Sequence, residues 1–121
     1  MQKLAAIILT TTILSGCAGP SLYQWGSYEQ MLYQSYKDPA KVEAMRTNLE
    51  SQILALESTG QRVAPGLHAE LGTLYLQSGN KGKAKAFYIK ERDTWPESRG
   101  LMNAVIDNLD KEPKRQTETP K

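Results

Sequence analysis

The chain has 121 residues and a formal net charge of +2 at pH 7. This length suits one small domain, and a charge so close to zero indicates no nucleic-acid partner. Cys17 is the only cysteine, which excludes a disulfide within the chain, so we expect helix packing to supply the stability.

Residues 1–16 have the features of a secretory signal peptide. Lys3 supplies a positive charge, and residues 4–14 form an apolar run. A run of about eleven residues lies within the roughly 7–15 of a signal peptide and is shorter than the roughly 20 that span a bilayer. The run leads into Leu14-Ser15-Gly16-Cys17, in which an aliphatic and two small residues precede the cysteine.

This sequence resembles the lipobox of bacterial prolipoproteins. The resemblance implies cleavage after Gly16, a diacylglyceryl group on the Cys17 thiol, and acylation of the new amine by a fatty acid such as palmitate. Two or more acyl chains are what stable anchoring requires, because one chain binds a membrane reversibly. Apart from this covalent lipid, we expect no cofactor. The alternative is a secreted protein with a chance cysteine.

The residue after the cysteine is Ala18 and not an aspartate. In the lipoprotein sorting that the resemblance brings with it, this choice implies the outer membrane of a Gram-negative cell, facing the periplasm. The inner membrane and the cell surface stay open as alternatives. Residues 17–22 would be a lipidated tether, too short to let the domain at 23–110 project far from the membrane.

An aromatic segment follows the tether, and a helix is predicted to begin in it with Ser27 as its N-cap. One interpretation is that Trp25, Tyr28 and Tyr36 close the end of the helical core. The other is a surface for a membrane or a partner, because tyrosine and tryptophan combine an apolar body with a polar tip. The full set of aromatic candidates is Tyr23, Trp25, Tyr28, Tyr33 and Tyr36.

The rest of the chain reads as further helices. Asp38-Pro39 is a helix start signal, and it precedes an amphipathic stripe with spacings of three and four that ends near Gly60. We expect a helix opening at Ala64-Pro65, another over 81–94 after Gly79-Asn80, and a short one after Pro96. Residues 111–121 contain no apolar side chain and are predicted to be disordered. The expected fold is all-α, with four to five helices. The residues of the first stripe are Val42, Met45, Leu49, Ile53 and Leu56.

Residues 65–98 resemble one tetratricopeptide unit. The resemblance implies a helical hairpin with small residues at the helix contact and apolar residues filling the space around it. His68 and Glu91 depart from the pattern, which has a large apolar and a small residue there. Residues 27–58 would form a second, degenerate pair, so the stack falls short of about three repeats and either its last helix or another chain must complete it. The motif positions are Leu71, Gly72, Tyr75, Ala84, Tyr88 and Pro96.

The opening Tyr23-x-Trp25-Gly26-x-Tyr28, with the repeat-like C-terminal half, is similar to a family of small Gram-negative lipoproteins of unknown function. What this second resemblance implies is a genetic neighbourhood that includes a lipoprotein like the curli-secretion channel and a second small lipoprotein. Other lipoproteins are therefore the expected protein partners. The family offers no active site whose residues could be carried over.

No catalytic or metal constellation stands out. His68 is the only histidine, and its partners would have to be carboxylates such as Glu70 or Glu91. A lone histidine on a helix is more often a packing or surface residue, and it makes no zinc set with a lipidated cysteine. Residues 79–83 lack the spacing of a phosphate-binding loop. We therefore expect a protein that is not an enzyme.

One helix concentrates basic side chains. Lys83 and Lys90 are seven residues apart, as are Lys85 and Arg92, so each pair lies on one side of the helix. A solvated helix face is the simpler interpretation, and contact with anionic lipid or an acidic partner is the alternative. The complete basic set is Lys81, Lys83, Lys85, Lys90 and Arg92.

The sequence thus favours a membrane-anchored, non-catalytic scaffold or accessory subunit of an outer-membrane lipoprotein or secretion-type assembly. The alternative is a module that binds peptide or cell wall in the groove of the helical repeat. Oligomerisation is left open by the shortage of repeats.

Overall fold

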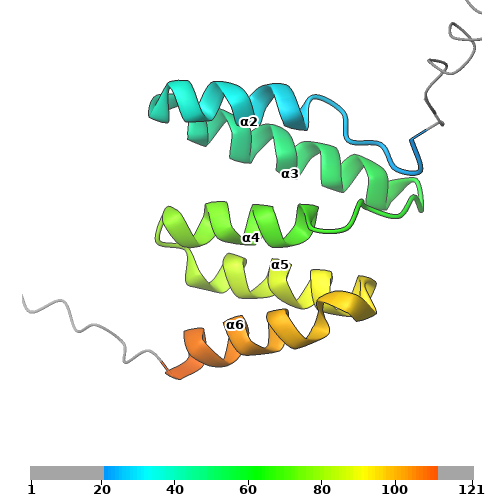
Figure 1. The fold of residues 1–121 in the computed structure, drawn as a ribbon, viewed down its shortest axis with the longest axis vertical. Coiled ribbons are helices and arrows are strands. Elements are labelled where there is room, and N and C mark those ends of the chain that lie inside the picture. The colour runs from blue at the N-terminus through cyan, green and yellow to red at the C-terminus, as the bar shows by residue number, and fades with distance from the viewer. Residues whose placement is uncertain (1–20, 112–121) are drawn as a thin grey trace, which may run out of the picture.

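A computed structural model describes residues 21–111 of the chain (Figure 1). The predicted signal peptide, the predicted lipidation site Cys17 and residues 112–121 of the predicted tail lie outside the described residues. Within 21–111 the fold is all-α and contains no strand, as predicted. The five helices are α2 (Tyr28–Lys37), α3 (Val42–Ser58), α4 (Leu67–Gln77), α5 (Lys81–Thr94) and α6 (Arg99–Lys111), and 3-10 turns at Pro39–Lys41 and Pro96–Ser98 precede α3 and α6.

Polar side chains cap two helix starts, and of these the cap at Asp38 is the one that the sequence predicts. The Asp38 carboxylate accepts a hydrogen bond from the Ala40 backbone N–H at 3.0 Å, and the Asn80 side chain does the same for Lys83 at 3.0 Å. Such bonds satisfy backbone donors that have no partner inside the helix. Ser27 is the N-cap residue of α2, as predicted, although its side chain makes no capping hydrogen bond.

The start of α4 also differs from the sequence expectation. The helix begins at Leu67 and not at Ala64-Pro65, because Gly66 has a left-handed backbone with φ of 90°. The Gly66 N–H donates to the Glu91 carboxylate at 2.8 Å. A long-range contact therefore sets this boundary, and Gly66 tolerates the conformation because it has no Cβ.

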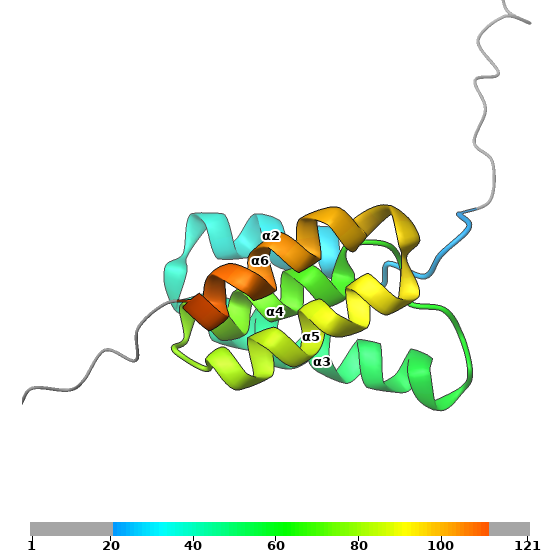
Figure 2. The ribbon, with the colours of Figure 1, turned by 90° about the horizontal axis from the view of Figure 1, so that it is seen from below.

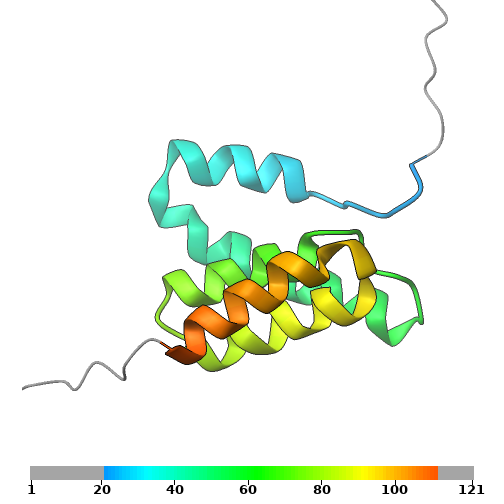
Figure 3. The same ribbon diagram turned by 60° about the horizontal axis from the view of Figure 1, so that its bottom comes forward.

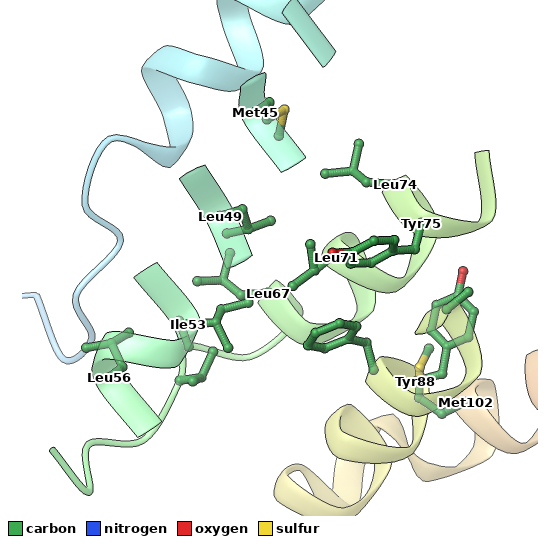
Figure 4. Packing of buried hydrophobic residues seen from close by; sticks show 14 of the residues in the cluster. Met45, Leu49, Ile53, Leu56, Leu67, Leu71, Leu74, Tyr75, Tyr88 and Met102 are labelled. Atoms are coloured by element: carbon green, nitrogen blue, oxygen red, sulfur yellow. The ribbon is translucent and has the colours of Figure 1, made fainter. Parts of the chain in front are cut away.

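The helices form a stack in which each one packs against the next along the chain. Figure 2 shows α2 and α6 on one side of the stack and the C-terminal part of α3 on the other, and Figure 3 shows α2 above the other helices. A single core runs through the stack, and Figure 4 shows α3 side chains meeting those of α4. The whole predicted stripe of α3 except Val42, which is half-buried, lies in this core. This arrangement is the tetratricopeptide-like stack that the sequence predicts.

The α4–α5 hairpin is the tightest contact of the stack. A Cβ added to Gly72 would lie 2.9 Å from the Tyr88 ring and 3.0 Å from the Ala84 carbonyl oxygen. Ala84 is fully buried, and Leu71, Tyr75 and Tyr88 are buried around it. Pro96 opens the turn before α6, and α6 continues to Lys111, one residue beyond the predicted domain boundary.

Candidate functional site

The two residues that depart from the tetratricopeptide pattern meet in the core. His68 on α4 and Glu91 on α5 are 3% and 1% exposed. The His68 Nδ1 atom lies 4.0 Å from Glu91 Oε2, and neither of these two buried atoms has a hydrogen-bond partner within residues 21–111. Glu91 was one of the two carboxylates proposed as partners of His68, and the other, Glu70, forms no such contact.

The remaining polar side-chain atoms of His68 and Glu91 do have partners. Glu91 Oε1 accepts hydrogen bonds from the Gly66 N–H at 2.8 Å and from the Ser98 hydroxyl at 3.0 Å. Because Gly66 precedes α4 and Ser98 precedes α6, one buried carboxylate holds the starts of two helices. These two hydrogen bonds give the Glu91 carboxylate a structural role at a position where the repeat usually has a small residue.

Glu57 on α3 completes the network. Its carboxylate lies 3.0 Å from His68 Nε2 and accepts from Lys90 Nζ at 2.9 Å. Partial burial opposes ionisation of Glu57, but the hydrogen bonds from Lys90 and His68 outweigh it and lower the pKa of this carboxyl below 4.5. The network therefore ties α3, α4 and α5 together. His68 and Glu91 are closed off from solvent, so this part of the network belongs to the core.

The basic helix α5 is largely neutralised by its neighbours. Lys83 and Lys90 face α3, where Glu50 and Glu57 are also seven residues apart, at Nζ–oxygen distances of 3.4 and 2.9 Å. Lys85 lies on the other side and contacts Asp110 of α6 at 2.7 Å. The shared side predicted for Lys83 and Lys90 is confirmed.

These partners favour a role for the basic residues between helices over contact with anionic lipid. Arg92 contacts its neighbour Asp93 at 2.9 Å, and Lys81 also has an interaction partner. Exposed pairs of this kind add little stability individually, about 0–1 kcal/mol.

The aromatic segment divides into two parts. Tyr23, Trp25 and Tyr28 are half-buried and pack against the core, with the Trp25 and Tyr28 rings 6.2 Å apart. Tyr33 and Tyr36 are 59% and 80% exposed. The core interpretation therefore holds for the position of Trp25 and Tyr28 but not for Tyr36, and the exposed rings of α2 are the ones available to a partner.

Trp95 is the residue that sequence reasoning missed. It is 7% exposed, and its ring meets Tyr23 edge-on with centroids 5.5 Å apart. The Arg62 guanidinium covers it at 4.9 Å from the ring centroid. Tyr23 thereby fixes the segment before α2 to the C-terminal end of α5, and Figure 1 shows both on the right-hand side of the stack. The signal in the sequence was a tryptophan directly before Pro96.

None of the helices within residues 21–111 is long and apolar enough to cross a membrane. In the same part of the chain, no three histidine, cysteine, aspartate or glutamate residues come together in a way that could hold a metal ion.

Comparison with known proteins matches the chain to one family model. The family model described as "Domain of unknown function (DUF4810)" matches residues 22–105. The chain belongs to this family. No curated protein and no solved structure matches it. The DUF4810 match covers all of α2–α5 and about half of α6. It therefore includes the buried network and the aromatic segment, and it agrees with the predicted membership of a small family of unknown function.

Proposed function

We propose that this protein is a lipid-anchored, non-catalytic scaffold that binds other lipoproteins of an outer-membrane, secretion-type assembly. The observation that carries the proposal is the lipobox-like Leu14-Ser15-Gly16-Cys17, which stands five residues before the start of the family match at residue 22. A membrane address would thus directly precede the folded domain.

The reach of the tether limits where the domain can act. Six residue steps separate Cys17 from Tyr23, which corresponds to roughly 20 Å when fully extended. Tyr23 is docked on Trp95, so the side of the stack that carries these two rings would stay close to the lipid headgroups. The outer membrane, facing the periplasm, is the location we propose, on the strength of Ala18 after the lipidated cysteine.

The distribution of chemistry supports a binding role. The one histidine is enclosed by Glu57 and Glu91, whereas α2 exposes the aromatic side chains of Tyr33 and Tyr36. Tyrosines are enriched in protein interfaces because they bury much area and keep a polar tip. The partners we propose, by the family resemblance, are a curli-secretion-channel-like lipoprotein and a second small lipoprotein.

Cell fractionation combined with affinity capture tests this function. We expect wild-type protein in the outer-membrane fraction, co-purifying with other lipoproteins after detergent extraction. Cys17→Ser should give folded protein outside the membrane fraction. Two results would refute the proposal: a Cys17→Ser protein that remains membrane-bound, or a wild-type protein that co-purifies with glycan and no lipoprotein. The latter would favour the alternative, a cell-wall-binding module.

A further inference from the structure

A small pocket lies between α2 and α4, with α3 contributing to its wall. Its volume is about 160 Å³, and three of its residues matter most: Leu32, Tyr36 and Glu70. Pockets for small-molecule ligands usually measure roughly 300–1,000 Å³. At about 30 Å³ per water molecule, this one has room for a few waters or one side chain. The pocket therefore suits a single residue of another chain.

Glu70 is the unusual group in this pocket. It is half-buried, and its carboxylate has no hydrogen bond or ion pair within residues 21–111. Burial raises the pKa of this carboxyl above 4.5, and no basic side chain offsets the effect. By contrast, Glu50, Glu57 and Asp110 all pair with lysines. A carboxylate in a partly apolar pocket with no cation beside it carries an uncompensated charge, which a positively charged group would stabilise.

Tyr36 supplies a second recognition element. Its ring is 80% exposed at the pocket, and aromatic faces attract ammonium and guanidinium groups. The basic side chains nearby are occupied elsewhere. Arg46 bonds Glu43 and Ser78, and Lys37 lies 4.5 Å from the centroid of the Tyr33 ring.

Two other surface hollows on residues 21–111 lack this combination. The pocket beside Arg46 contains a carboxylate that Arg46 already neutralises. The hollow near Gly26 is lined by uncharged residues. The Glu70 pocket is distinguished from both because it joins an unpaired carboxylate to an exposed aromatic ring.

We propose that this pocket binds the cationic side chain of a lysine or arginine presented by a partner protein. The charged head would pair with Glu70, and its methylene stem would lie along Tyr36 and Leu32. This inference rests on the proposed partner-binding function and names the chemistry of one contact in it. It does not depend on the membrane anchor.

Peptide binding to the full chain in detergent tests the assignment. The probes are two blocked pentapeptides with the sequence glycine-leucine-X-leucine-glycine, where X is lysine in one and glutamine in the other. We expect the lysine peptide to bind about tenfold more tightly, which is the effect of one charge-assisted hydrogen bond. Glu70→Gln should make the two affinities equal. The matched control Glu29→Gln changes an exposed carboxylate on α2 and should keep the preference.

Thermal melting separates recognition from a structural role for Glu70. Glu70→Gln should melt no lower than wild type at pH 7, since it removes an unpaired, half-buried charge. Tyr36→Ala should weaken the lysine peptide several-fold with little change in melting, because the ring is exposed.

Several results would overturn the assignment. They are equal affinity of wild type for both peptides, a lysine preference that survives Glu70→Gln, and a preference lost equally in Glu29→Gln. If only a chain ending at residue 111 prefers the lysine peptide, the chain's own basic tail occupies the pocket and the partner assignment is wrong. Failure of lipoprotein capture with an intact peptide preference would refute the proposed assembly and leave the pocket standing.

Discussion

Replacing Glu91 by alanine should destabilise the domain strongly. The substitution removes the acceptor for the Gly66 N–H and the Ser98 hydroxyl, at 2.8 and 3.0 Å. A buried donor left without a partner costs about 1–3 kcal/mol, and the vacated space adds a cavity term. Loss of the unpartnered Oε2 atom offsets part of this cost. We expect a net loss of about 2–4 kcal/mol, a drop in melting temperature of roughly 10–20 °C for a domain of this size.

Glu91→Gln is the informative companion. Glutamine keeps a carbonyl oxygen for Gly66 and Ser98, and its amide can donate toward the unpartnered His68 Nδ1 atom. We therefore expect a change within about 1 kcal/mol. Urea and thermal unfolding followed by circular dichroism give both values, with the exposed Glu97→Ala as control at about 0.5 kcal/mol or less. The reasoning fails if Glu91→Ala melts like Glu97→Ala, or if glutamine is as damaging as alanine.

Four further substitutions, at Gly72, Gly100, Glu70 and Cys17, have distinct expected outcomes. Gly72→Ala should destabilise by about 1–3 kcal/mol because its Cβ would lie 2.9 Å from the Tyr88 ring, while Gly100→Ala, with nothing within 4 Å, should stabilise by about 0.5–1 kcal/mol in the same melts. Burial raises the pKa of Glu70 above 4.5, so the protonated carboxyl stabilises the fold below pH 4.5 and this contribution is lost as pH rises through the raised pKa. Glu70→Gln should therefore be more stable than wild type at pH 7, and the gain should shrink toward pH 4.5. A gain that does not change with pH would contradict this. Intact mass of the membrane-extracted protein should lack residues 1–16 and carry lipid, and Cys17→Ser should carry none.

Patterns that act over a few residues could be predicted from the sequence. The α3 stripe at spacings of three and four places Met45, Leu49 and Ile53 in the core, since helical periodicity fixes which side chains share a face. Capping by Asp38 is likewise local. The close approach at Gly72 followed from the repeat resemblance.

Contacts between distant residues could not be predicted in this way. His68 and Glu91 each read as a misfit at its own position, and only the packing of α4 on α5 makes them neighbours. The packing of α4 on α5 also places the start of α4 at Leu67, because the Glu91 carboxylate accepts a hydrogen bond from the Gly66 N–H and keeps Gly66 outside the helix. Docking of Tyr23 on Trp95 joins positions 72 residues apart, which no periodicity encodes.

The ion pairs of the structure bear on what the basic side chains of α5 contact, a question that the sequence left open. Seven-residue spacing placed Lys83 and Lys90 on one side of α5, but it could not say what they face. Their partners Glu50 and Glu57 repeat the same spacing on α3. Glu70 differs from Glu50 and Glu57 because it has no basic partner, and only the structure reveals this difference.

Site-specific photo-crosslinking in living cells tests most directly whether the aromatic face of α2 binds another protein at the membrane. A photoreactive residue at Tyr36 is compared with one at Leu54, which is 53% exposed on α3. We expect position 36 to crosslink to another outer-membrane lipoprotein, and position 54 to give no such product. Absence of a crosslink at position 36, or equal products at both positions, would contradict a partner on this face.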